Sequence, residues 1–232
     1  MAKKPKPHEL RSQSFRVKTN LERSSIPRKI LPERHLFVTE GKKTEPNYLK
    51  NIIDLICDRY GQEARRQFEI IGEGDNTLNL LQCAERYQQN AAEGYQHVWI
   101  IYDQDDFPAD SFDNVAGRCK ALTNRFQDEG RDTAFHAIWS NQCIELWFLL
   151  HFDYMHANIT RDEYRKRLSA CIGRHYEKAD ATVFAQLRPK LNTAVKNAKR
   201  LMAEYNAEFP PSRRAPATNV YELIEYLKPY MQ

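Results

Sequence analysis

The 232-residue sequence has only five cysteines, and no two of them lie close together along the chain. An odd number at wide spacing argues against a disulfide framework and excludes a zinc site of the Cys-x-x-Cys type. A nucleotide-binding glycine loop is missing as well. The Gly-Lys-Lys-Thr run at 41–44 is not a P-loop, because Leu36 stands where that motif needs its first glycine and Lys43 where it needs Ser or Thr.

Long apolar runs are also absent. No stretch approaches the ~20 residues that a membrane-spanning helix needs, and the longest, residues 144–152, is interrupted by Glu145 and His151. The opening Met-Ala-Lys-Lys-Pro-Lys-Pro has no apolar region of the kind found in secretory signals. We therefore expect a cytoplasmic protein with no membrane partner.

The net charge of +4 conceals an uneven distribution of charge along the chain. Residues 1–34 contain ten Lys or Arg and three Glu, whereas the remainder has 25 bases and 28 acids. A basic arm thus precedes a mildly acidic body. The arm is either a solvated tail, as charge-rich polar segments often are, or a segment that binds nucleic-acid phosphates. The sequence supports the two interpretations about equally.

Beyond the arm, short apolar runs alternate with amphipathic stretches. The pattern predicts strands at 35–40, 68–71, 97–102 and 134–139, and helices at 45–60, 77–89, 111–127 and 144–150. Thr44 suits the N-cap of the first helix, and Ser140 or Asn141 suits that of the last. Such alternation predicts a parallel sheet with helices on both faces.

Downstream of Phe152 only helical patterns are visible, at 161–172, 183–205 and 218–230. We therefore expect three parts: a basic N-terminal arm (1–34), an α/β core (35–152) and a helical C-terminal extension packed on that core (153–232).

Acidic residues follow two of the predicted strands. Glu40 ends the first strand and precedes Gly41, while Asp103 and Asp105 follow the third, with Asp106 behind them. Ligands of open α/β sheets bind beyond the carboxyl ends of the strands, and residues two apart in an extended chain face the same side. Carboxylates gathered there suit Mg²⁺, or Mn²⁺ in its place. The alternative for each cluster is a solvated turn, since Asp favours turns.

Three motifs in order resemble the RloB family. They are Phe-Val-Thr-Glu-Gly-Lys-Lys-Thr-Glu-Pro-Asn-Tyr at 37–48, Tyr-Asp-Gln-Asp-Asp at 102–106, and Ser-Asn-Gln-Cys-Ile-Glu-Leu-Trp-Phe-Leu-Leu-His-Phe at 140–152. The likeness continues in Tyr176, Lys178, Pro216, Thr218 and Val220, so it covers nearly all of the chain after the arm. Thr39 and Gln142 depart from the commoner cysteine and proline, but neither is an expected ligand.

The resemblance implies a Toprim-like core and a metal-dependent nuclease of bacterial anti-phage defence, often encoded beside an ATPase partner. The Toprim pattern of Glu-Gly after one strand and Asp-x-Asp after a later one maps onto Glu40 and onto Asp103 with Asp105. Asp106 is a further candidate helper.

Other residues have more than one interpretation. Glu145 lies in a strongly apolar segment, so its carboxylate needs an ion pair, a metal or a proton. One expectation for Glu145 is structural, a buried cap or an ion pair with an Arg of the downstream helices. The other is functional, a second metal ligand or an acid that orients the substrate. Lys42, Lys43 and Thr44, with Asn141, are candidate substrate contacts, whereas the alternative for the lysines is a solvated turn. Trp147 is expected in the core and His151 at a helix end.

The sequence as a whole favours Mg²⁺-dependent hydrolysis of nucleic-acid phosphodiester bonds. Glu40 would either complete the metal shell or move a proton. The alternative is a non-catalytic subunit that binds nucleic acid or a partner protein. DNA, tRNA and other RNA remain open as substrates, and so does assembly into a homo-oligomer.

Overall fold

The computed structural model describes residues 30–73, 77–104 and 108–232. Residues 32–232 form one compact unit, and the fold described below is that of this unit. The unit starts two residues before the predicted end of the basic arm. Arg34, the last residue of the predicted arm, is hydrogen-bonded to this unit, because its backbone N–H donates to Gln96 Oε1 at 2.8 Å.

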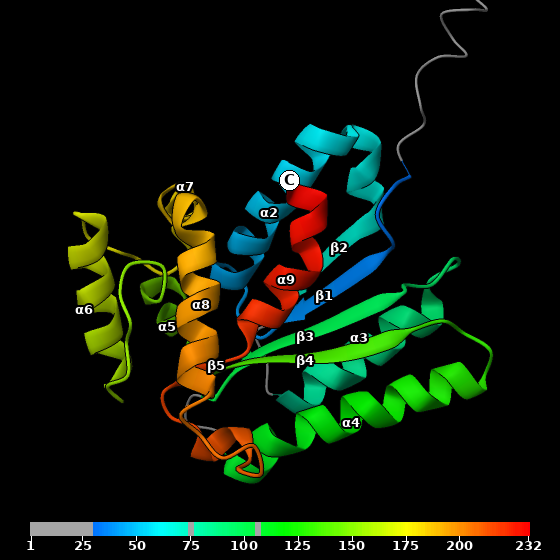
Figure 1. Cartoon of the computed structure of the whole chain (residues 1–232). Coiled ribbons are helices and arrows are strands. Elements are labelled where there is room, and N and C mark those ends of the chain that lie inside the picture. Colours follow the sequence, from blue (N-terminus) through cyan, green and yellow to red (C-terminus); the bar gives the residue numbers. More distant parts are fainter. Residues whose placement is uncertain (1–29, 74–76, 105–107) are drawn as a thin grey trace, which may run out of the picture. The chain divides into compact units, whose positions relative to one another are not determined.

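A five-stranded sheet lies at the centre of this unit (Figure 1). The spatial order is β2-β1-β3-β4-β5. Its strands are β1 (His35–Thr39), β2 (Phe68–Gly72), β3 (His97–Asp103), β4 (Ala134–Asn141) and β5 (Ala217–Thr218). The first four run parallel, and β5 pairs antiparallel with the end of β4. All five residues of β1 are buried, as expected for a strand covered on both faces.

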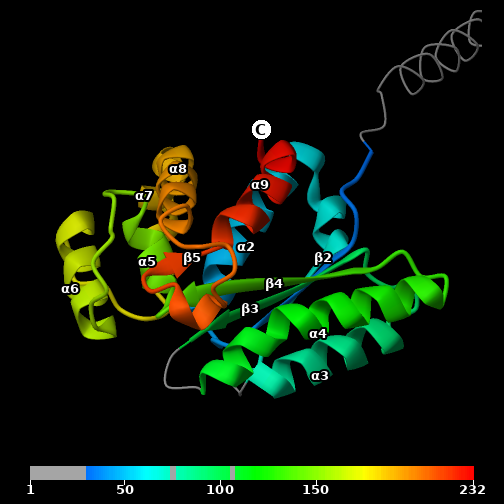
Figure 2. The ribbon, with the colours of Figure 1, turned by 60° about the horizontal axis from the view of Figure 1, so that its bottom comes forward.

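Helices cover the two faces of the sheet (Figure 2). The α-helices are α2 (Thr44–Tyr60), α3 (Thr77–Asn90), α4 (Ala109–Asp128), α5 (Ile144–Leu149), α6 (Arg161–Ile172), α7 (Val183–Leu187), α8 (Leu191–Met202) and α9 (Val220–Met231). Short 3₁₀ helices occupy Gln62–Gln67, Arg188–Lys190 and Pro211–Arg213. None of the helices in the described ranges is both long and apolar enough to cross a membrane.

Side chains that alternate along the strands divide the apolar interior into two cores. Leu36 and Val38 of β1 pack with α3 and α4 on one face, whereas Phe37 packs with α2 and α9 on the other. This is the two-residue period of a strand with both faces buried. The predicted α/β class is therefore confirmed, as are the four parallel strands and the helices that connect them.

The C-terminal extension differs from its prediction. It is not helical throughout, because residues 217–218 join the sheet as β5. The helix predicted at 183–205 is three pieces, α7, a 3₁₀ turn and α8. The interruption includes Pro189, which lacks the N–H that a continuous helix requires.

The two predicted helix caps are wrong. Thr44 is the first residue of α2, whose N-cap is Lys43, and Thr44 Oγ1 instead accepts from the backbone N–H of Ala179 at 3.3 Å. Ser140 and Asn141 belong to β4, and Cys143 is the N-cap of α5.

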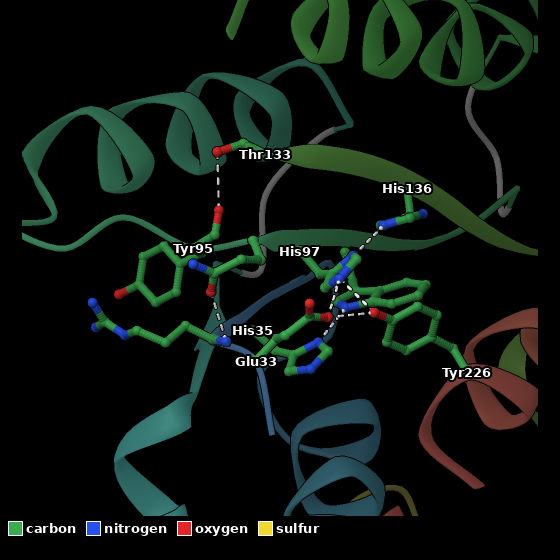
Figure 3. Close-up of polar contacts among 10 residues, drawn as sticks. Glu33, His35, Tyr95, His97, Thr133, His136 and Tyr226 are labelled. Atoms are coloured by element: carbon green, nitrogen blue, oxygen red, sulfur yellow. Dashed lines mark hydrogen bonds and ion pairs between the residues drawn. The ribbon is translucent and has the colours of Figure 1, made fainter. Parts of the chain in front are cut away.

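A polar and aromatic cluster marks the amino ends of the strands (Figure 3). His35 of β1 stands beside His97 of β3, and His97 Nδ1 lies 3.0 Å from His136 Nε2 on β4. Glu33 Oε2 contacts His97 Nε2 at 2.9 Å and accepts from Tyr226 Oη at 2.7 Å. The C-terminal helix α9 is thereby joined to the start of the sheet.

Two histidines of this cluster are held neutral by the fold. Burial, followed by the neighbouring imidazoles, lowers the pKa of the fully buried His35 to about 3, and that of His136 to about 4. His35 Nδ1 accepts from Trp99 Nε1 at 3.1 Å, which leaves its proton on Nε2. The unfolded chain, with a histidine pKa near 6.5, binds protons that the folded chain does not.

We therefore expect stability to be fully present above pH ~6.5 and to be lost as the pH falls toward 4. At pH 5 the loss from His35 should be about 2 kcal/mol, with a smaller loss from the partly exposed His136. Urea unfolding at pH 7 and pH 5 measures the difference. His35→Gln should reduce the pH dependence, whereas His156→Gln, at an exposed position, should leave it unchanged. Equal pH dependence in all three proteins would contradict the assignment.

Candidate active site

Glu40 and Asp103 lie together at the carboxyl edge of the sheet. Asp103 ends β3 and Glu40 directly follows β1, and these two strands are hydrogen-bonded neighbours. The backbone N–H of Glu40 donates to Ile101 O at 3.0 Å, which extends the ladder past the end of β1. The backbone N–H of Asp103 donates to Glu40 Oε2 at 3.1 Å. Both residues are half-buried.

The short helix α5 brings a third carboxylate to this edge. Asp103 Oδ2 accepts from the backbone N–H of Ile144, the first residue of α5, at 3.1 Å. Glu145 follows immediately and is only 2% exposed. Arg165 Nε of α6 lies 3.5 Å from Glu145 Oε1, which is the predicted ion pair with a downstream arginine. Oε1 nevertheless has no hydrogen-bond partner.

Glu45 is a fourth carboxylate, which the sequence analysis missed. It occupies the first turn of α2 and is 6% exposed. A Cβ built on Gly41 would lie 1.9 Å from Glu45 Oε2, so only glycine allows this carboxylate to pack against the β1–α2 turn. Oε2 is buried without a hydrogen-bond partner. Acids are common in the first turn of a helix, because the helix dipole favours negative charge there. The position of Glu45 in the sequence therefore did not indicate a functional residue.

Each of these carboxylates affects the charge state of others. Burial raises the pKa of Asp103 well above its usual value, and the negative charges of Glu45, Glu145 and Glu40 raise it further. Burial likewise raises the pKa of Glu40 to about 7, with a further contribution from Glu45. Burial and Glu145 raise the pKa of Glu45. The four side chains thus share one small region of space.

Two cations partly offset this concentration of negative charge. Arg161 and Lys178 both lower the pKa values of Glu40 and Glu45. The remaining repulsion can be relieved by protons or by a bound cation, because like-charged carboxylates at one site cannot all ionise cheaply.

The donor set fits a hard divalent cation by its chemistry. All four groups offer oxygen, the ligand atom that Mg²⁺ prefers, and Glu45 Oε2 and Glu145 Oε1 are buried oxygens without partners. Within the described ranges, no group of three or more His, Cys, Asp or Glu side chains is already placed to hold a metal ion. Asp105 and Asp106, the other two expected acids, lie outside the described residues.

The expected substrate contacts have different surroundings. Lys42 and Lys43 are exposed on the turn after Glu40, where an anion could meet them. Thr44 Oγ1 is engaged with the backbone of Ala179. Asn141 is 2% exposed, and its Nδ2 donates to the carbonyl oxygens of residues 211 and 212. Asn141 therefore supports a neighbouring loop from within the fold.

Trp147 and His151 on the other side of α5 are core residues. Trp147 is fully buried, as predicted, and its Nε1 donates to Tyr48 Oη at 2.9 Å. His151 Nδ1 lies 2.9 Å from Trp147 O and so caps the helix end. Burial lowers the pKa of His151 to about 4, so this cap is a neutral imidazole.

The three sequence motifs thus meet at one place in the fold, where β1, β3 and α5 end or begin. The model of the RloB-like protein family matches residues 35–227. The chain belongs to the RloB-like family. Comparisons with curated proteins and with solved structures found no match. The matched range includes the C-terminal helices and β5, so the RloB-like unit is the sheet together with its extension.

If the carboxylates of this RloB-like protein repel one another, removing the Glu45 charge should stabilise the metal-free fold. Glu45→Gln keeps the shape of the side chain but removes either a buried charge or the cost of protonating it. We expect the melting temperature in EDTA to rise by about 2–6 °C. Glu63→Gln, an exposed change of the same kind, should shift it by less than about 1 °C. A lower melting temperature for Glu45→Gln would show that the crowding is not repulsive.

Proposed function

We propose that this RloB-like protein is a metal-dependent nuclease that hydrolyses nucleic-acid phosphodiester bonds in a bacterial anti-phage defence system. The observation that supports the proposal is the convergence of Glu40 and Asp103 with Glu45 and Glu145 at the carboxyl edge of the sheet. Ligands of open α/β sheets bind at this edge. Four acids gathered there, two of them buried, are costly for the fold unless they serve a cation or a proton transfer.

Each carboxylate has a distinct part in this proposal. Glu40, Asp103 and the buried pair Glu45 and Glu145 would hold Mg²⁺ or Mn²⁺, together with Asp105 and Asp106 from outside the described residues. A divalent ion at such a site polarises a phosphoryl oxygen and lowers the pKa of bound water. The backbone N–H groups of Asp103 and Ile144 hold one oxygen each of Glu40 and Asp103, so these side chains are oriented before substrate arrives.

Glu40 is the residue with two candidate roles. Its Oε2 is engaged by the Asp103 backbone, whereas no hydrogen bond from a described residue is made to Oε1. Oε1 is therefore free either to ligate a cation or to take a proton from an attacking water molecule.

The surface around the acids suits an anionic substrate. Lys42 and Lys43 are exposed and directly follow Glu40 and Gly41 in the chain. In this position their ammonium groups would meet phosphates next to the bond that is cleaved. The proposed place of action is the cytoplasm, with an ATPase of the same locus as partner.

Glu40→Gln and Asp103→Asn should each reduce Mg²⁺-dependent cleavage of DNA or RNA by about two orders of magnitude or more. Their melting temperatures should be equal to or above that of the wild type, because each change removes a charge from a crowded group. Cleavage should be assayed with the protein alone and with the neighbouring ATPase, and Mg²⁺ binding by isothermal titration calorimetry.

Asp110→Asn is the matched control, since Asp110 is an exposed acid at the start of α4, and it should retain wild-type activity. Full activity in both site variants would refute the proposal. A protein that binds nucleic acid, but neither binds Mg²⁺ nor cleaves under any of these conditions, would be the non-catalytic binding subunit instead.

A further inference from the structure

Helix α6 lies directly beside the carboxylates and carries a series of basic residues. Arg161, Arg165, Lys166 and Arg167 all lie in its first two turns. Arg165 reaches Glu145 at 3.5 Å, and Arg161 lowers the pKa of Glu40 and Glu45. In the ribbon, α5 and α6 lie next to one another beyond the carboxyl ends of the strands (Figure 1).

The segment 174–180 returns from the end of α6 toward the start of α2. Gly173 ends α6 with φ 70°, a left-handed conformation that reverses the chain at little cost. The backbone N–H of Tyr176 then donates to Ser169 Oγ at 3.0 Å, which holds the segment along α6.

The far end of the same segment is attached to α2. Ala179 donates its backbone N–H to Thr44 Oγ1 at 3.3 Å and accepts from Asn47 Nδ2 at 2.9 Å. These contacts bring the chain at Lys178 close to the start of α2, which directly follows Lys42 and Lys43 in the sequence.

A groove of about 540 Å³ lies between α6 and this segment. Arg165, Lys166, His175 and Lys178 contribute basic side chains to its lining. Two acids, Asp162 and Glu177, also line it. The Asp162 carboxylate is paired with Arg165 Nη1 at 3.4 Å, and Glu177 is exposed. Lys166 and Lys178 are exposed, and no described carboxylate lies within 4.0 Å of either ammonium group, although Lys178 also lowers the pKa of Glu40 and Glu45. Both ammonium groups are therefore available to a ligand in the groove.

We propose that this groove binds the phosphate backbone of a nucleic-acid strand, with Lys166 and Lys178 contacting phosphates that flank the bond to be cleaved. This inference rests on the proposed nuclease function and deepens it. An acidic centre repels a polyanion, so the strand must be held by cations on either side. Lys42 and Lys43 supply such cations on the turn after Glu40, and the groove supplies them on α6 and the segment 174–180.

The test measures binding separately from cleavage. In the Glu40→Gln background of the full chain, fluorescence anisotropy would follow a fluorescein-labelled single-stranded oligonucleotide and, in a second arm, the matching duplex. We expect Lys166→Ala/Lys178→Ala to weaken binding by about tenfold or more at low salt. The slope of log affinity against log salt should fall by about 1.4–1.8, the amount for two lost phosphate contacts.

The matched control is Lys120→Ala/Lys196→Ala, which removes the same charge from exposed positions on α4 and α8. It should bind as the Glu40→Gln parent does. If the two double variants bind equally, or if the parent binds neither oligonucleotide, the groove assignment is overturned. The arm in which affinity falls more identifies the strand form that the groove holds.

Failure of the inference can be told apart from failure of the proposed function. If Lys166→Ala/Lys178→Ala lowers affinity but the wild type never cleaves, the groove stands and hydrolysis is refuted. If Glu40→Gln abolishes cleavage while the lysine variant binds and cleaves as the wild type does, the nuclease stands and the groove is refuted.

Discussion

Mutual repulsion among buried and half-buried carboxylates is the constraint around which the carboxyl edge of the sheet is built. Asp103 receives negative charge from Glu45, Glu145 and Glu40 together. The fold opposes this repulsion locally. Backbone N–H groups hold Glu40 and Asp103, and Arg165 lies against Glu145. The backbone N–H groups come from the end of β3 and the start of α5, and Arg165 comes from α6, which packs against α5.

The amino and carboxyl ends of the strands differ in how they treat buried charge. At the amino ends, the imidazoles of His35 and His136 are kept neutral, and Glu33 is compensated by Tyr226 and His97. At the carboxyl ends, charge is concentrated instead and left partly open to solvent. Between them lie two apolar cores, one on each face of the sheet. This interior gives the stability that allows a strained charge cluster to persist at one edge.

The parts of the fold that the sequence predicted are those determined locally. Strands β1, β3 and β4 are nearly continuous apolar runs because both of their faces are buried, and such runs can be recognised without knowing their partners. Glu145 could be identified as needing a partner because an acid in an apolar segment is costly wherever it lies. Its arginine, Arg165, could be expected only as a residue type.

The parts that were missed depend on contacts distant in sequence. The two residues of β5 form a strand only because the end of β4, 76 to 78 residues earlier in the chain, offers an edge to pair with. Glu45 joins the site because Gly41 has no side chain, a steric fact that becomes visible only once the turn is built. Asn141 was predicted as a helix N-cap because nothing local distinguishes the last residues of β4 from the start of α5.

The C-terminal extension contributes charged residues to the site and does more than cover the core. The core contributes most of the negative charge, on Glu40, Glu45, Asp103 and Glu145, whereas the extension contributes Arg161, Arg165 and Lys178. Without α6 and the segment 174–180, the carboxylates would lose the nearest cations that lower their pKa values. A bound ion would then have to offset the whole repulsion alone. The RloB-like match, which runs through this extension to residue 227, agrees with a unit in which acids and bases are kept together.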